Sequence, residues 1–164
     1  IRKTLFYDPE IRVPLLIRLP GGEHRVVDEI VELIDLAPTL LELAGLKPEP
    51  EASLDGASLT GLLHGKTDAW KNRAFCENYW PARTERDGTK LPEDYGRALI
   101  RDGFKCCLGG NMPDPNSLFD LQNDPHELQN LWEDPAHRTR RDAMQEAIEA
   151  DWTKIDHPLR AHSP

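Results

Sequence analysis

The spacing of apolar and polar positions changes several times along this chain, and each pattern predicts a different kind of secondary structure. The first apolar run covers residues 13–19, is rich in Leu and Ile, and stops at Pro20-Gly21. A run of this kind, closed by a turn signal, is typical of a strand buried on both faces of a largely parallel sheet. We therefore predict a buried strand over 13–19, preceded by a charged and aromatic loop over 3–12. A second apolar piece, residues 26–31, fits either a short strand or the lead-in to a helix.

Helical spacing begins near Asp35. Residues 36–44 place Leu and Ala in two adjacent rows, which predicts a helix of about ten residues. Asp35 is a good N-cap, Pro38 is tolerated because it falls in the first turn, and Gly45 closes the helix as a C-terminal cap. After a polar connector, a second and shorter helix is expected to run through Leu62-Leu63.

From residue 71 onward, the pattern changes to short apolar runs separated by turn residues. The strand candidates are 73–79, 97–101, 104–108 and 117–121. Asp102-Gly103 joins two of them, and Asp-Gly between apolar runs is a strong hairpin signal. A final amphipathic helix is predicted over 135–155, with an apolar face made of Met144, Ile148, Trp152 and Ile155. We expect this helix to lie on a short antiparallel sheet.

Composition excludes several classes of partner. The chain has 164 residues, of which 38% are hydrophobic and 30% charged, so it is long enough for an ordinary core. Its formal net charge of -9 argues against a nucleic-acid surface, because phosphate binding favours a basic face. No apolar run is long enough to span a membrane. The chain starts at Ile1 without an initiator Met or a signal-peptide pattern, so we expect it to be part of a longer protein.

The cysteines, histidines and aspartates do not form a recognisable metal site. Three cysteines show no metal-ligand spacing, and the Cys106-Cys107 pair lies in an apparent strand, where neighbouring side chains point to opposite faces. We interpret these cysteines as structural thiols. No two histidines have the close helical spacing of a zinc site. Four aspartates occupy cap or turn positions and are not interpreted as metal ligands: Asp35, Asp55, Asp120 and Asp124.

The opening stretch combines charged and aromatic residues in a specific order. A lysine, an aromatic, an acid and a guanidinium lead into the apolar run, as Lys3, Tyr7, Asp8, Arg12 and then Val13-Pro14. This order resembles a segment of type I sulfatases, in which a lysine precedes a Tyr-Glu pair and an Arg-Val-Pro strand entrance. Asp8 stands where Glu is usual. Later stretches also resemble that family in order and spacing, over 34–45, 55–65, 97–105 and 118–131.

The chain therefore resembles the C-terminal portion of a type I, formylglycine-dependent sulfatase of the alkaline-phosphatase-like superfamily. The resemblance implies an α/β fold. Residues 1–70 would finish the large α/β domain, and residues 71–164 would form a C-terminal α+β subdomain. The family's formylglycine arises in a Cys/Ser-x-Pro-x-Arg motif, and neither this motif nor an Asp-Asp or Asp-Asn pair for the family's Ca²⁺ occurs here. We expect both cofactors in a missing N-terminal catalytic portion, and we expect no activity from the chain alone.

By the same resemblance, Lys3 is the active-site lysine whose ammonium contacts the sulfate. Sulfate ester cleavage moves negative charge between the sulfuryl oxygens and the leaving oxygen, and a fixed cation lowers that cost. A solvated surface residue is the ordinary interpretation of a lone lysine, but the surrounding pattern favours the catalytic one. Tyr7, Asp8 and Arg12 are interpreted as support that fixes this loop through charge-assisted hydrogen bonds.

The connection over 80–95 is long for a compact sheet, and long loops are often functional. In sulfatases such loops border the substrate cleft, so Trp80, Arg83 and Arg86 are candidates for binding a sulfated small molecule or carbohydrate. Two other functions remain open. One is a phosphonate monoester or phosphodiester hydrolase of the same superfamily. The other is a non-catalytic α+β binding module.

Overall fold

The computed structural model describes residues 5–22, 24–47, 54–80, 83–84, 88–91, 94–109 and 116–152. The chain divides into two compact units. Unit 1 combines Ile1–Pro14 with Phe75–Pro164, and unit 2 is Leu15–Ala74. The opening residues therefore belong with the C-terminal half of the chain. The predicted assignment of 1–70 and 71–164 to two domains concerns a longer protein and stays a prediction.

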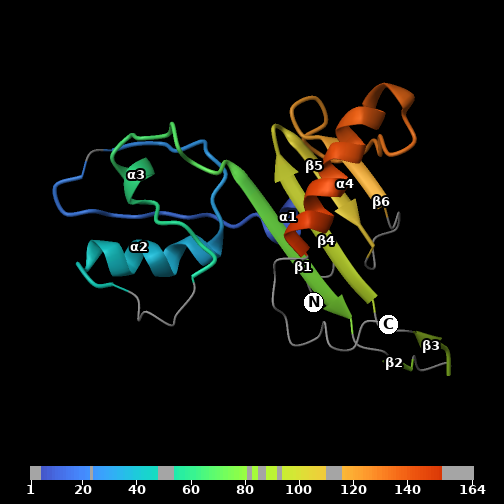
Figure 1. Cartoon of the computed structure of the whole chain (residues 1–164), viewed down its shortest axis with the longest axis horizontal. Helices are drawn as coiled ribbons and strands as arrows, with labels where there is room; N and C mark the ends of the chain where they lie inside the picture. Colours follow the sequence, from blue (N-terminus) through green and yellow to red (C-terminus); the bar gives the residue numbers. More distant parts are fainter. Residues whose placement is uncertain are drawn as a thin grey trace. The chain divides into compact units, whose positions relative to one another are not determined.

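Unit 1 is built on a four-stranded sheet with the strand order β1-β4-β5-β6 (Figure 1). These strands are β1 (Arg73–Trp80), β4 (Asp94–Arg101), β5 (Phe104–Leu108) and β6 (Asn116–Asp120). The β4–β5 and β5–β6 pairs are antiparallel. Asp102 and Gly103 both have positive φ, at 52° and 75°, so the predicted Asp-Gly hairpin is confirmed. A separate two-stranded ladder, β2 (Arg83–Thr84) with β3 (Lys90–Leu91), interrupts the predicted long loop.

The last helix follows β6 and covers one face of this sheet (Figure 1). It consists of a 3₁₀ turn, η2 (Pro135–His137), and α4 (Arg138–Trp152), which agrees with the predicted start. Met144 and Ile148 are buried against Leu99, Cys106 and Leu118. The mixed α/β architecture, with an antiparallel sheet and helices, confirms the predicted fold class.

The two faces of the sheet have different partners because side chains alternate along a strand. Cys106 packs in the cluster under α4, whereas Cys107 packs with Phe6 and Ala98 in a second cluster. The predicted opposite orientation of the two cysteines is therefore confirmed. Phe6 belongs to the second cluster, and Leu5, Tyr7 and Ile11 pack against it, so these residues lie against the face that α4 does not cover.

The described residues of unit 2 form a 3₁₀ turn and two helices: η1 (Leu33–Asp35), α2 (Leu36–Leu43) and α3 (Thr60–Leu63). Gly45 has a φ of 68°, and hydrogen bonds from Gly45 N to Glu42 O and from Leu46 N to Leu41 O close α2. The predicted helix and its glycine cap are confirmed. Asp35 does occupy the N-cap position, but its carboxylate does not cap α2.

The predicted strand over 13–19 is wrong. The structure assigns no strand there, and Leu16 is 91% exposed. A buried parallel strand needs neighbours on both sides for its backbone groups and side chains, and the described part of the chain places no strand beside it. Residues 26–31 form neither a strand nor a helix. The opening loop instead contains one unpredicted helical turn, α1 (Asp8–Ile11). No helix in the described ranges is long and apolar enough to cross a membrane.

Candidate functional site

Residues 5–12, here called the opening segment, lie directly against the sheet of unit 1. Phe6 is 3% exposed and packs with Ala98 and Cys107. The ring of Tyr7 lies 5.9 Å from the ring of Phe119 on β6. Within the segment, the Leu5 amide donates to the Glu10 carboxylate at 2.8 Å, and α1 supplies one helical turn. The residues that follow Lys3 in sequence are therefore held by both apolar and polar contacts.

A fully buried lysine, Lys105, lies in the middle of β5 and makes polar contacts with the opening segment. Its Nζ donates to Asp8 Oδ1 at 2.5 Å and to Phe6 O at 2.9 Å, and it lies 2.7 Å from Glu127 Oε1. Two of the three N–H groups of this ammonium therefore have hydrogen-bond acceptors, and the ion pair with Glu127 adds a second carboxylate next to its charge. Glu127 Oε2 also accepts from the Asp8 amide at 2.8 Å. We call Lys105, Asp8 and Glu127 the buried lysine cluster.

Two free-energy costs indicate how strongly the buried lysine cluster constrains the local structure. Removing one partner of a buried ion pair typically costs about 3–5 kcal/mol, because the remaining charge stays buried. Glu127 also adopts a φ of 55°, in the left-handed region, which costs a non-glycine residue roughly 1–2 kcal/mol. Such strain persists only where surrounding contacts determine the conformation. The carboxylate of Glu127 supplies such contacts, since it forms an ion pair with Lys105 and accepts a hydrogen bond from the backbone amide of Asp8.

The turn that carries Glu127 is fixed by its own aspartates. The Asp124 carboxylate accepts from the Gln129 amide at 2.8 Å, and hydrogen bonds of this kind hold the pKa of Asp124 below its usual value. The Asp120 carboxylate accepts from the side chain of Asn123 at 2.8 Å, and this bond likewise lowers the pKa of Asp120. The predicted turn roles of both aspartates are confirmed. The turn thereby presents Glu127 to Lys105.

An open cavity of about 840 Å³ adjoins the cluster, between residues 7–14 and 125–128. Arg12 lies at this cavity with a largely exposed side chain, and its guanidinium is 3.6 Å from Asp8 Oδ2. Asp8 therefore contacts a buried cation on one side and an exposed cation on the other. This is the supporting role predicted for Asp8 and Arg12, but the main partner of Asp8 is Lys105, which we did not predict.

A signal for Lys105 was present in the sequence. Its neighbours on β5 are Phe104, Cys106, Cys107 and Leu108, and a single charge in the middle of an apolar strand indicates a buried ion pair. The identity of its partners was not readable, because Asp8 is 97 positions away.

The predicted site residues lie mostly outside the described structure. Lys3 and Arg86 are outside the described residues. Trp80 ends β1 and Arg83 begins β2, and their side chains are not described. The catalytic role of Lys3 and the substrate-binding roles of the other three residues stay predictions.

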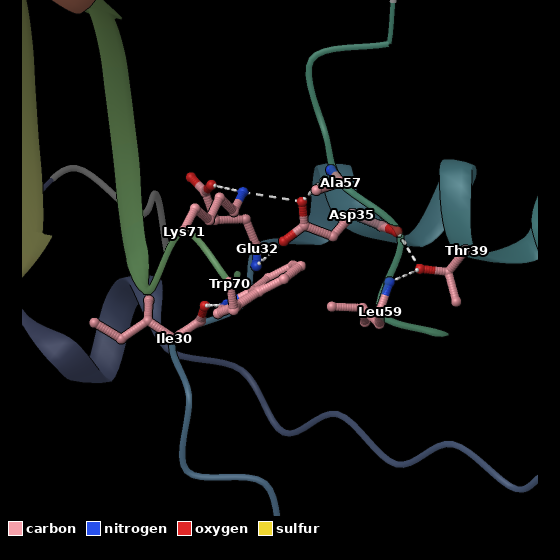
Figure 2. Close-up of polar contacts among 8 residues, drawn as sticks. All are labelled: Ile30, Glu32, Asp35, Thr39, Ala57, Leu59, Trp70 and Lys71. Atoms are coloured by element: carbon pink, nitrogen blue, oxygen red, sulfur yellow. Dashed lines mark hydrogen bonds and ion pairs between the residues drawn. The ribbon is translucent and has the colours of Figure 1, made fainter. Parts of the chain in front are cut away.

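Unit 2 contains a second polar network, centred on Asp35 (Figure 2). The fully buried Asp35 carboxylate accepts from the Glu32 amide and the Ala57 amide, both at 2.8 Å, and from Lys71 Nζ at 2.9 Å. Lys71 also pairs with the Glu32 carboxylate. The Thr39 hydroxyl donates to Asp35 O and accepts from the Leu59 amide at 2.8 Å. Because these contacts tie α2 to the residues around α3, we interpret this network as structural.

Neither thiols nor acidic clusters supply obvious chemistry in the described ranges. Burial raises the pKa of both Cys106 and Cys107 to about 12, so neither is a thiolate nucleophile near neutral pH. Among the described residues, no three His, Cys, Asp or Glu side chains are grouped so that they would hold a metal ion. The buried lysine cluster and the opening segment are therefore the best-supported parts of a candidate site.

Comparison with known proteins shows similarity along almost the whole chain. Residues 1–154 match the family model described as N-sulphoglucosamine sulphohydrolase, C-terminal. The uncharacterized sulfatase YidJ of Escherichia coli is 33% identical over 158 residues, which cover 95% of this chain and 29% of that protein. The N-acetylglucosamine-6-O-sulfatase of Bacteroides thetaiotaomicron is 28% identical over 153 residues, covering 90% of this chain and 26% of that protein. The chain thus spans under a third of these relatives.

Solved structures show the same fold at lower identity. The phosphonate monoester hydrolase of Agrobacterium radiobacter has a TM-score of 0.60 and 24% identity, over 78% of this chain and 26% of that one. A protein solved in complex with its substrate D-glucosamine-2-N,6-O-disulfate has a TM-score of 0.57 and 21% identity, over 73% of this chain and 23% of that one. At these identities the similarity establishes the fold alone.

Proposed function

The chain belongs to the sulfatase family as a C-terminal sulfatase region, and we propose that it forms part of an enzyme that hydrolyses sulfuric esters. The observation that carries this proposal is the family match over residues 1–154, which includes the opening segment and the buried lysine cluster. The predicted activity is that of a longer protein, because the chain spans under a third of its sulfatase relatives.

In this proposal Lys3 contacts the sulfate group of the substrate. A lysine offers a compact positive charge on a long stem, which suits a group that reaches a sulfuryl oxygen from a loop. Fixed donors aimed at developing negative charge typically lower the barrier by several kcal/mol. The contacts of Phe6 and Asp8 support this role, because they fix the chain a few residues after Lys3.

We propose a sulfated small molecule or carbohydrate as the substrate. A relative named for N-acetylglucosamine-6-O-sulfate cleavage and a family model named for N-sulphoglucosamine favour a sulfated amino sugar. Trp80, Arg83 and Arg86 would then contact it. An indole stacks on a sugar ring, and guanidinium groups pair with carboxylate or sulfate oxygens.

Sulfatases generally use a formylglycine nucleophile and Ca²⁺, and the described residues of this chain do not fit either group. The sequence has no Cys/Ser-x-Pro-x-Arg motif. The described ranges contain no group of three potential metal ligands. We therefore assign no residue of this chain to these cofactors and place both in another part of the full-length protein.

The test is turnover by the full-length protein on matched substrates. We expect hydrolysis of 4-nitrophenyl sulfate and of glucosamine 6-sulfate, and at least about tenfold lower kcat/KM on a 4-nitrophenyl phosphonate monoester. A preference for the phosphonate would establish the alternative hydrolase. Absence of turnover on all three substrates by folded protein would favour the binding module.

The role of Lys3 is tested separately by Lys3→Ala. We expect kcat for 4-nitrophenyl sulfate to fall by a factor on the order of 10² to 10³, the scale for removing one preorganised charge-stabilising group. Lys66→Ala is the matched control, because Lys66 is an exposed lysine of the same chain. A Lys3→Ala enzyme within about threefold of the parent would exclude the assigned role, since this corresponds to well under 1 kcal/mol of barrier.

A further inference from the structure

We propose that Lys105 is a positioning residue for the sulfatase reaction. Through Asp8 and Glu127 it fixes the opening segment on the sheet, and thereby fixes the position from which Lys3 reaches the substrate. This inference rests on the proposed function, because it requires Lys3 to act on the sulfate. Lys105 itself is not a catalytic residue, since its ammonium is fully buried and occupied by protein acceptors.

The first argument is the position of Lys105 in the sheet. It lies on β5, an interior strand that is paired with β4 on one side and β6 on the other. Interior strands are the most firmly held part of a sheet, because their backbone groups are bonded on both sides. An apolar side chain at this position would avoid the desolvation of a charge. The lysine therefore adds directional contacts that packing at this site does not require.

The second argument is the distribution of its contacts. The ammonium bonds the carbonyl of Phe6 and the carboxylate of Asp8, so it contacts the backbone and a side chain of the opening segment. Glu127 adds a bond to the Asp8 amide. Apolar packing of Phe6 alone is non-directional and would tolerate a shift along the sheet. Three charge-assisted hydrogen bonds to residues 6–8 hold the opening segment in one position on the sheet.

The third argument is the contrast with Lys71. That lysine also pairs with two carboxylates, Glu32 and Asp35, but its contacts lie within unit 2. A purely structural lysine network is thus present in the same chain. It provides a control in which ion pairs are lost without any change to the opening segment.

The experiment is a double-mutant cycle in the full-length protein. Lys105→Met and Lys71→Met are each made with and without Lys3→Ala, and kcat and KM for 4-nitrophenyl sulfate are measured where circular dichroism shows the variants folded. We expect Lys105→Met to lower kcat at least about tenfold when Lys3 is present, because small displacements of a catalytic group are costly. In the Lys3→Ala background the loss should be under about twofold, since residues that act through one another are not additive.

The cycle separates positioning from stability. Lys71→Met should lower the melting temperature yet change kcat less than about twofold in either background. Equal losses from Lys105→Met in both backgrounds would overturn the inference and leave Lys105 as a structural residue. If Lys3→Ala has no effect on an active parent, the assigned role of Lys3 fails and the inference fails with it. An inactive parent would instead refute the proposed function.

A second variant covers the case in which Lys105→Met does not fold. Asp8→Asn keeps the Lys105–Glu127 pair and the hydrogen bond from the Asp8 amide to Glu127, because both use atoms that the substitution leaves in place. We expect a smaller loss of kcat, about three- to tenfold, which again disappears in the Lys3→Ala background. Persistence of the full loss in that background would overturn the inference.

Discussion

The network around Asp35 allows us to predict how much stability is lost when Asp35 is replaced. Its carboxylate is fully buried and faces three donors: the Glu32 amide, the Ala57 amide and the Lys71 ammonium. Asp35→Ala leaves two partly buried amides without their acceptor and a partly buried ammonium with one carboxylate fewer. Breaking a buried charged network in this way typically costs about 3–5 kcal/mol.

Asp35→Asn should be almost as damaging as Asp35→Ala. An asparagine side chain has one acceptor oxygen, and its NH₂ group would face a donor in place of the second carboxylate oxygen. Lys71→Met should cost less than either, because Asp35 then keeps both amide bonds. The Lys71 side chain is also 22% exposed, so water replaces part of its contacts.

Amide hydrogen exchange measures this loss of stability at the backbone amides that belong to the network. The Ala57 amide donates to Asp35, and the Leu59 amide donates to Thr39, which in turn bonds the Asp35 carbonyl. Local destabilisation of about 3 kcal/mol accelerates exchange of these amides roughly a hundredfold. Glu42→Ala, which removes an exposed carboxylate from α2, is the control and should leave both rates unchanged. Exchange within about threefold of the parent in Asp35→Ala would show that the network contributes little.

Three further outcomes are expected. Cys106 and Cys107, with pKa values of about 12, should resist alkylation at pH 8 until urea unfolds the protein, while the less buried Cys76 reacts earlier; equal rates in the folded state would contradict the assigned burial. Replacing residues 82–92 by a short Gly-Ser link removes, among the described residues, the β2–β3 ladder and no strand of the four-stranded sheet, so that sheet should fold. It should raise KM for the native sulfated substrate far more than for a small aryl sulfate, and equal losses on both would leave this segment without a substrate role. The isolated 164-residue chain should bind a hydrophobic dye or aggregate, because residues 13–19 expose large apolar side chains; a monomer with a sharp melt and no dye binding would refute this.

The sequence alone was sufficient wherever a structure depends on near neighbours. The row spacing of Leu36–Leu43 and the glycine at position 45 predicted α2 and its end, because helix periodicity and left-handed caps are local properties. The Asp102-Gly103 turn fixed the β4–β5 hairpin for the same reason. The alternation of side chains in a strand placed Cys106 and Cys107 on opposite faces. The motif order also indicated the family, which the match over residues 1–154 confirms.

Only the tertiary structure decided which distant groups meet. The apolar run over 13–19 looked like a buried strand, but strand formation requires partners, and none lies beside it in the described ranges. Asp35 looked like a helix cap, yet its carboxylate bonds Ala57 and Lys71, 22 and 36 positions away. The charge of Lys105 inside an apolar strand indicated a buried ion pair, but it did not reveal the partner, Asp8, which lies 97 positions away. A buried charge is stable only beside its counter-charge, and the fold, not local sequence, brings the two together.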